Sequence, residues 1–225
     1  VTNLPKLLPK DDGTPGPRNG VMCAGIEHKM GINGSATCVM SFEGALGWLL
    51  GEPHRGMRAM FTMMNDARLD VGLQGLAIAE TAYQSAVAYA RERLQGRPMG
   101  TRHGPPVAII EHADVKRMLL AHKAYAEGSL ALCLYCARLI DEHVNADASA
   151  LLGLLTPVAK TFPSEYGLAA NDLAIQIHGG YGYARDFDVE QLYRDNRLNA
   201  IHEGTTGIQA MDLLGRKVLR GDGRG

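Results

Sequence analysis

The segment Gln176–Gln209, QIHGGYGYARDFDVEQLYRDNRLNAIHEGTTGIQ, decides how the rest of the sequence is interpreted. One glycine-bearing turn begins at Gly179, a second contains Gly204, and a short amphipathic stretch, 186–198, lies between them. Such turns let the backbone approach a ligand where a Cβ atom would collide. Glu203 directly precedes the second turn, where a carboxylate at a helix start lies beside free N–H groups. The segment therefore indicates a ligand-binding corner with one candidate base.

The composition narrows the class of protein. The chain has 225 residues, of which 46% are hydrophobic and 21% charged, enough for a core in one or two domains. The net charge is −1 without a long basic run, which argues against a nucleic-acid or anionic-membrane surface. No apolar run reaches the roughly 18 residues of a membrane span. The first residues also lack the apolar region of a signal peptide. We expect a cytoplasmic protein, or one of the mitochondrial matrix if the source is a eukaryote.

The cysteines indicate packing rather than chemistry. Cys133 and Cys136 form a C-x-x-C pair inside the apolar run ALCLYCARLI, and no second pair stands at metal-site spacing. We therefore expect small buried side chains in a reducing compartment, not a zinc or redox site.

The first part of the chain, 1–53, has the turn residues and short apolar segments that are typical of β-structure. Prolines and the Asp11-Asp12-Gly13 sequence mark turns, and the short apolar pieces 21–23 and 37–42 suit strands. We interpret 1–53 as the C-terminal remnant of a β-domain.

The second part, 54–225, is expected to be a helical domain. Apolar residues recur at helical spacing over 56–94 without a proline, and a glycine- and proline-rich loop follows at 96–106. Long helices with short links predict a mainly α fold, an antiparallel four-helix-type bundle. The further helices are expected at about 107–144, 151–177, 188–198 and 205–219.

Two kinds of residue refine this expectation. Gly72 and Gly75 weaken the first helix intrinsically, which suggests close contact with another backbone. Pro157 suggests an interruption of the third helix at Thr156-Pro157, and Pro163 would strain an uninterrupted version.

Two common nucleotide-binding motifs are missing from the sequence. There is no G-x-G-x-x-G after a strand and no G-x-x-x-x-G-K-[ST], so nicotinamide-type Rossmann and P-loop interpretations are excluded.

Three separated motifs, QIHGGYGY, LYRDNR and IHEGTTGIQ, resemble in order and spacing the C-terminal domain of the FAD-dependent acyl-CoA dehydrogenase family. The segments EHKMGINGSATCVM, MMNDARLDVGLQGLAIAE and MDLLGRK resemble a longer branch that includes the methylmercaptopropionyl-CoA dehydrogenases. The resemblance covers nearly the whole chain. It implies α,β-dehydrogenation of an acyl-CoA thioester to the trans-2-enoyl-CoA. Family members carry further domains, so the chain is expected to be a fragment.

The resemblance also implies roles for single residues. Glu203 matches the base that removes the α-proton, and the N–H of Gly204 is expected to face the thioester carbonyl. Asn65 and Arg68 match a pair near the acyl-CoA substrate, although a solvated or salt-bridged helix face is an equal alternative. His202 and His178 are expected to fill aromatic positions.

The cofactor implied by the resemblance is FAD, since a hydride has to leave the β-carbon for an acceptor that no side chain provides. The residues that match flavin contacts in the family are Arg93, Gln176, Gly179, Gly180, Thr205 and Gly207.

The family implies electron-transfer flavoprotein as the electron acceptor and a homodimer or homotetramer as the assembly. Two alternatives stay open: an acyl-CoA oxidase-type flavoenzyme that uses oxygen, and an inactive truncated helical module without flavin.

Overall fold

The computed structural model describes residues 1–142 and 144–219. The chain divides into two compact units, one of residues 1–64 and one that begins at residue 65. Among the described residues, no helix combines the length and the apolar character needed to cross a membrane.

The first unit consists of short antiparallel strand pairs. β4 (Val21–Ile26) pairs with β5 (Cys38–Phe42), which confirms the strands expected at 21–23 and 37–42. The other pairs are β1 with β6 and β2 with β3. Their bounds are β1 Thr2–Asn3, β2 Leu7–Pro9, β3 Pro15–Arg18 and β6 Trp48–Leu49.

One buried amide holds the loops of this unit together. Asn19 is 6% exposed, and its Nδ2 donates to the carbonyls of Pro5 at 2.9 Å and Leu46 at 2.8 Å. Its Oδ1 accepts from the N–H of Leu46 at 2.9 Å. A buried amide that is bonded on both sides satisfies backbone groups that the short strands leave unpaired.

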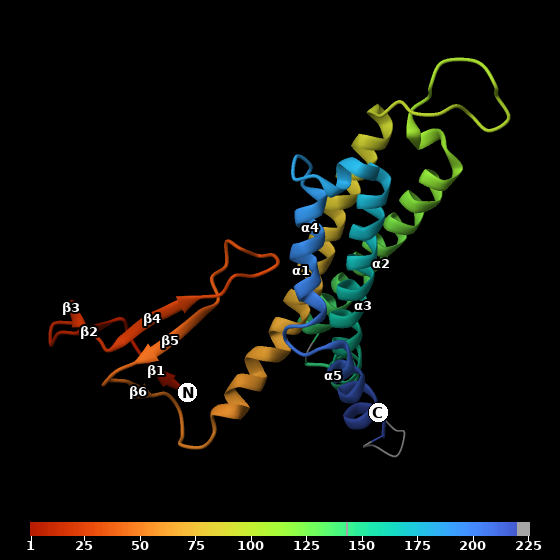
Figure 1. The fold of residues 1–225 in the computed structure, drawn as a ribbon. Coiled ribbons are helices and arrows are strands. Elements are labelled where there is room, and N and C mark those ends of the chain that lie inside the picture. Colours follow the sequence, from red (N-terminus) through yellow and green to blue (C-terminus); the bar gives the residue numbers. More distant parts are fainter. Residues whose placement is uncertain (143, 220–225) are drawn as a thin grey trace. The chain divides into compact units, whose positions relative to one another are not determined.

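The second unit is helical, which confirms the mainly α fold. Its long helices are α1 (Gly56–Glu92), whose residues 56–64 belong to the first unit, α2 (Ala113–Asp141) and α3 (Ala146–His178). The three run in alternating directions, and the short α4 (Val189–Asn196) follows a turn (Figure 1). The last elements that the structure describes are α5 (Thr206–Met211) and the π-helical turn η4 (Asp212–Val218). Single 3₁₀ turns complete the unit: η1 Ile109–Glu111, η2 Gly179–Tyr183 and η3 Arg197–Ala200.

The core between the long helices is built largely from small side chains. Ala82, Ala86 and Ala90 of α1 are fully buried, one turn apart on one face. On α2, Cys133 and Cys136 are also buried, and burial raises the pKa of the Cys133 thiol to about 11. A thiol with a raised pKa stays protonated and packs as a small apolar group.

α3 continues through both of its prolines, so the expected interruption at Thr156-Pro157 is wrong. Pro157 has no N–H, and it leaves the carbonyl of Gly153 without its usual helical donor. The ammonium of Lys217 donates a hydrogen bond to that carbonyl. The helix can therefore run on because a side chain from η4 replaces the missing donor.

The second proline produces a close helix contact instead. Pro163 frees the carbonyl of Ala159, and this oxygen lies where a Cβ atom on Gly72 would have to stand. One turn further along α1, a Cβ on Gly75 would lie 3.0 Å from the carbonyl oxygen of Pro163. The close backbone contact expected at these two glycines is therefore confirmed.

We expect Gly72→Ala to destabilise the second unit by about 1–3 kcal/mol, the usual cost of overpacking a core. Alanine gains about 1 kcal/mol over glycine in a helix, but the clash here is with backbone that cannot turn aside. Gly128→Ala in α2 is the matched control, since its nearest foreign atoms would lie 3.8 Å away on Phe162. Urea unfolding should show opposite signs for the two variants; equal signs would contradict the argument.

His122 links the stability of the bundle to pH. Its ring is fully buried on α2, and Nε2 donates to the carbonyl of Ala79 at 2.9 Å. Burial lowers the pKa of His122 below its ordinary 6.5. As the pH falls below 6.5, the unfolded chain binds the proton first, so the free energy of unfolding decreases.

Denaturant titrations at about pH 7.5 and about pH 5.5 measure this loss. His122→Gln removes the titrating group and should make the difference between the two pH values smaller. An unchanged difference would assign the acid sensitivity to other groups.

Candidate functional site

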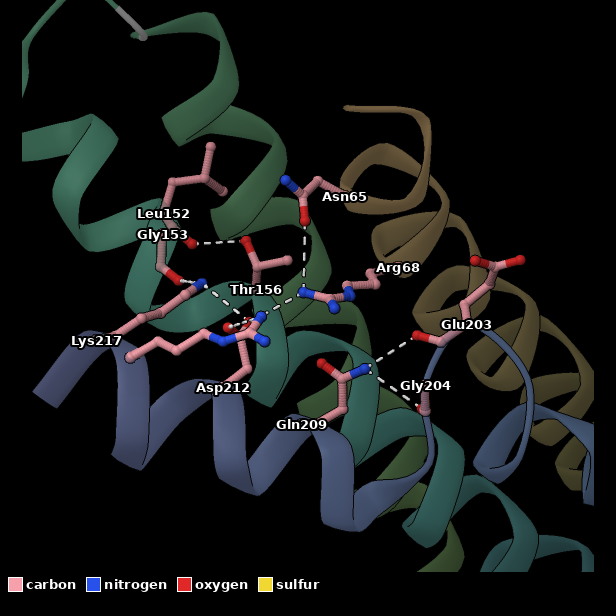
Figure 2. A network of polar contacts seen from close by, with 11 residues as sticks. Asn65, Arg68, Leu152, Gly153, Thr156, Glu203, Gly204, Gln209, Asp212 and Lys217 are labelled. Carbon is pink, nitrogen blue, oxygen red and sulfur yellow. Dashed lines mark hydrogen bonds and ion pairs between the residues drawn. The ribbon is translucent and has the colours of Figure 1, made fainter. Parts of the chain in front are cut away.

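The candidate base sits on a strained turn that a glutamine side chain holds. Glu203 has φ +52°, a left-handed conformation that costs a non-glycine residue about 1–3 kcal/mol. Gln209 of α5 is 1% exposed, and its Nε2 donates to the carbonyls of Glu203 at 3.0 Å and Gly204 at 3.3 Å (Figure 2). A Cβ on Gly204 would lie 2.7 Å from the same nitrogen. The turn therefore requires glycine at position 204, whereas Glu203 occupies a strained conformation that the turn itself does not explain.

The carboxylate of Glu203 is left free by this arrangement. The side chain is half-buried and extends away from the Gln209 amide (Figure 2). Within the part of the chain that the structure describes, its oxygens make no hydrogen bond and no ion pair. A carboxylate whose backbone is fixed and whose oxygens are uncommitted can accept a proton from a bound molecule.

A buried ion pair lies beside the turn. Arg68 of α1 donates to Asp212 of η4 at 3.0 Å, and the two side chains are only 6% and 10% exposed. The ammonium of Lys217 lies 3.7 Å from the same carboxylate. Asn65 accepts from Arg68 at 3.4 Å and is exposed. Of the two expected substrate residues, Arg68 is thus committed to Asp212, and Asn65 faces solvent.

A second buried cation lies near the turn. Lys160 of α3 is fully buried, and its ammonium has no hydrogen-bond partner among the described residues. Burial lowers the pKa of Lys160, while the charges of Glu165 and Glu203 act in the opposite direction. Burial and the nearby Lys160 also lower the pKa of His202. The surroundings of Glu203 therefore favour a neutral His202.

Three of the expected flavin residues share a pocket at the other end of the bundle. Arg93, Gln176 and Gly179 line a cavity of about 300 Å³ between the end of α1 and the end of α3. The guanidinium of Arg93 lies 5.5 Å from the ring centre of Tyr181, and it pairs with no carboxylate among the described residues. An exposed, unpaired guanidinium beside a cavity suits an anionic ligand.

The turn after α3 gives this pocket its open edge. Gly179 has φ +62°, and a Cβ on either Gly179 or Gly180 would meet no atom within 4 Å. His178 is buried, and its ring stacks on Tyr89 at 4.3 Å between ring centres. It fills an aromatic position, as expected, and Nδ1 bonds to the carbonyl of Ala174.

The remaining two flavin candidates lie elsewhere. Thr205 and Gly207 line a different cavity of about 350 Å³, together with Arg197 of η3 and Glu165 of α3. The structure therefore places five of the six expected flavin residues in two separate pockets of one chain, and Gly180 lines neither of these two pockets.

Several residues that surround Glu203 could not be identified from the sequence. Gln209 is the last residue of the motif IHEGTTGIQ. The sequence does not show that its side chain donates to two carbonyls earlier in the chain. Asp212 and Lys217 are five residues apart in the sequence. Their side chains lie on the same side of the helix because η4 is π-helical, with hydrogen bonds between residues five apart. Lys160 lies within a predicted helix, and no pattern in the neighbouring sequence indicates that its side chain is completely buried.

Comparison with known proteins decides the family. The model of the acyl-CoA dehydrogenase C-terminal domain matches residues 54–219. The chain belongs to the acyl-CoA dehydrogenase family. The 3-methylmercaptopropionyl-CoA dehydrogenase of Ruegeria pomeroyi is 46% identical over 227 residues, which cover 98% of this chain and 39% of that protein. The chain thus spans about two fifths of the length of this relative.

Solved structures show the same fold. The butyryl-CoA dehydrogenase of Megasphaera elsdenii superposes with a TM-score of 0.75 at 25% identity, over 93% of this chain and 54% of that one. A structure described as the electron transferring flavoprotein of Acidaminococcus fermentans matches with a TM-score of 0.77 at 26% identity. That match covers 95% of this chain and 55% of the other chain.

Proposed function

We propose that this chain supplies the base of an FAD-dependent acyl-CoA dehydrogenase, which converts an acyl-CoA thioester to the trans-2-enoyl-CoA. The observation that carries the proposal is the free carboxylate of Glu203 on a turn fixed by Gln209. Membership of the acyl-CoA dehydrogenase family supports it.

In the proposed reaction, a Glu203 oxygen takes the proton from the α-carbon, and the electron pair of that C–H bond forms the new double bond. The N–H of Gly204 donates to the thioester carbonyl and stabilises the charge that develops there. FAD, when bound, would supply the hydride acceptor for the β-carbon, a role that no side chain can take.

The pocket at Arg93 fits the phosphate-bearing part of FAD. The unpaired guanidinium offers positive charge and several N–H donors, and the backbone of Gly179-Gly180 has open space in front of it. We assign Arg93, Gln176, Gly179 and Gly180 to that part. Thr205 and Gly207 lie in the other pocket, so we propose that they meet a second flavin, bound mainly by a neighbouring copy of the chain.

This division of the flavin residues suggests the assembly. Each of the two pockets holds only some of the residues proposed to contact flavin. We therefore propose that copies of the chain complete each site in a homodimer or homotetramer. We further propose electron-transfer flavoprotein as the electron acceptor, which the likeness to the Acidaminococcus fermentans structure supports.

A hybrid enzyme tests the proposed function. In it, the 225-residue chain replaces the homologous part of the Ruegeria pomeroyi dehydrogenase, to which 98% of the chain aligns. We expect the purified hybrid to be yellow and an acyl-CoA to bleach its flavin without oxygen. Slow reoxidation by air and fast reoxidation by electron-transfer flavoprotein would exclude the oxidase alternative. A flavin-loaded hybrid that no acyl-CoA bleaches would contradict the proposal.

A further inference from the structure

A line of buried amide side chains runs from the middle of the helical unit to the residue before Glu203. Asn171 of α3, Asn196 of α4 and Asn199 of η3 are all fully buried. Asn199 Nδ2 donates to Asn196 Oδ1 at 2.8 Å, and Asn199 Oδ1 bonds to His202 Nε2 at 3.0 Å. We call these four residues the amide relay. None of them but His202 belongs to the site described above.

The relay starts at a backbone carbonyl of α1. Asn196 Nδ2 donates to the carbonyl of Gly75 at 3.3 Å and to Oδ1 of Asn171. A Cβ on Gly167 would lie 3.2 Å from this nitrogen, so that glycine makes room for the amide. Helices α1, α3 and α4 thus meet at one side chain.

The direction of every bond in the relay follows from this start. A backbone carbonyl can only accept, so Asn196 has to turn its nitrogen toward Gly75 and its oxygen toward Asn199. Asn199 then has to present its nitrogen to Asn196 and its oxygen to His202. An amide oxygen only accepts, and therefore Nε2 of His202 carries a hydrogen.

The other ring nitrogen is left as an acceptor. Burial, as the largest cause, and the charge of Lys160 lower the pKa of His202, while the charge of Glu203 acts in the opposite direction. A neutral ring with a hydrogen on Nε2 has a lone pair on Nδ1. The relay therefore selects one tautomer of the histidine that precedes the candidate base.

The relay and Gln209 hold the strained turn from two sides. Gln209 fixes the carbonyls of Glu203 and Gly204, while Asn199 fixes the side chain of His202. A residue held at φ +52° keeps that conformation only when its surroundings over-determine it.

We propose that the amide relay positions Glu203 by holding His202 as the neutral tautomer with its hydrogen on Nε2. His202, Asn199 and Asn196 are then positioning residues for proton abstraction. The tautomer stands independently of the proposed function, whereas the effect on proton abstraction rests on it.

Nitrogen NMR of the 225-residue chain tests the tautomer. We expect His202 at neutral pH to show a protonated Nε2 and an unprotonated Nδ1. Asn171→Ala keeps the Gly75 carbonyl as the start of the relay and should preserve this state. Asn199→Leu removes the acceptor and should give a mixture of tautomers, with a shifted Gly204 amide resonance. A hydrogen on Nδ1 in the unmodified chain, or an unchanged ring in Asn199→Leu, would overturn the proposal.

The hybrid enzyme tests the positioning. His202→Phe keeps an aromatic ring without a donor, and we expect flavin reduction by acyl-CoA to slow about 10- to 100-fold, the loss that a misplaced base brings. Flavin content and acyl-CoA affinity should stay the same. His202→Gln restores a donor toward Asn199 and should recover most of the rate.

An isotope effect separates positioning from a purely structural role. With substrate deuterated at the α-carbon, the isotope effect should rise in His202→Phe, because proton abstraction becomes slower than the other steps. A slow variant with an unchanged isotope effect, or an equal rate in His202→Phe and His202→Gln, would overturn the positioning. An unmodified hybrid without activity would contradict the proposed function alone, since the NMR result decides the relay.

Discussion

Glu203→Gln should lower the rate of anaerobic flavin reduction in the hybrid enzyme by about 10⁴-fold, the upper end of what a positioned general base contributes. Glutamine has nearly the same size, and the bonds that fix this turn go to the carbonyls of Glu203 and Gly204. The turn should therefore persist. The only loss is the basic carboxylate, whose oxygens have no other partner among the described residues.

The measurement is stopped-flow bleaching of the flavin by acyl-CoA without oxygen. Flavin content and acyl-CoA binding should be retained, because neither depends on the charge of this side chain. Glu127→Gln is the control: this carboxylate is 60% exposed on α2, and its loss should leave the rate within about threefold. If Glu203→Gln reduces its flavin at the parent rate, the base lies elsewhere in the enzyme.

The sequence allowed the helical part of the fold to be predicted well because its signals are local. Residues 56–94 lack proline and repeat apolar side chains at helical spacing, and α1 occupies Gly56–Glu92. The glycines at 72 and 75 also pointed to a close contact. Their partners were not predictable, because they are backbone carbonyls of Ala159 and Pro163 on another helix.

Pro157 is a position where the local sequence predicted the wrong structure. Proline in a helix normally breaks it, since a donor is lost and a carbonyl is left unpaired. The structure supplies the replacement donor from Lys217, which lies 60 residues away in the sequence. The third helix therefore continues for a tertiary reason that no window around Pro157 contains.

The candidate site divides in the same way. Glu203 and Gly204 were identifiable because the motif that carries them is contiguous. Asn171, Asn196 and Asn199 were not, because buried asparagines have no sequence pattern that separates them from asparagines on a surface. The domain boundary expected between 53 and 54, and the flavin and substrate roles assigned by resemblance, stay predictions.

Asp212→Ala should destabilise the second unit by about 3–5 kcal/mol, which is the usual cost of removing one partner of a buried ion pair. The side chain of Arg68 is 6% exposed, so water cannot replace the lost carboxylate. Its Nε already lacks a partner among the described residues. Lys217 would lose its nearest anion at the same time.

Asp114→Ala is a control with nearly the same geometry in a different solvent environment. Asp114 lies 2.9 Å from Arg117, but the two side chains are 71% and 65% exposed. An exposed pair contributes up to about 1 kcal/mol, even at the start of a helix where a carboxylate is favoured. Urea unfolding of both variants compares the two contexts directly, and equal losses would show that burial does not strengthen the Arg68–Asp212 pair.

A double variant distinguishes the unpaired charge from a loss of packing. Arg68→Met combined with Asp212→Leu replaces both charges by apolar side chains, and such replacements are often neutral or stabilising. We therefore expect the double variant to recover most of the stability that Asp212→Ala loses. Such non-additive effects of two substitutions are typical of residues in contact. Because Asp212 and Gln209 lie on successive helical segments after Glu203, stability recovered without activity would mean that the pair also orients the Glu203 turn. A double variant as unstable as Asp212→Ala would instead assign the loss to packing around η4.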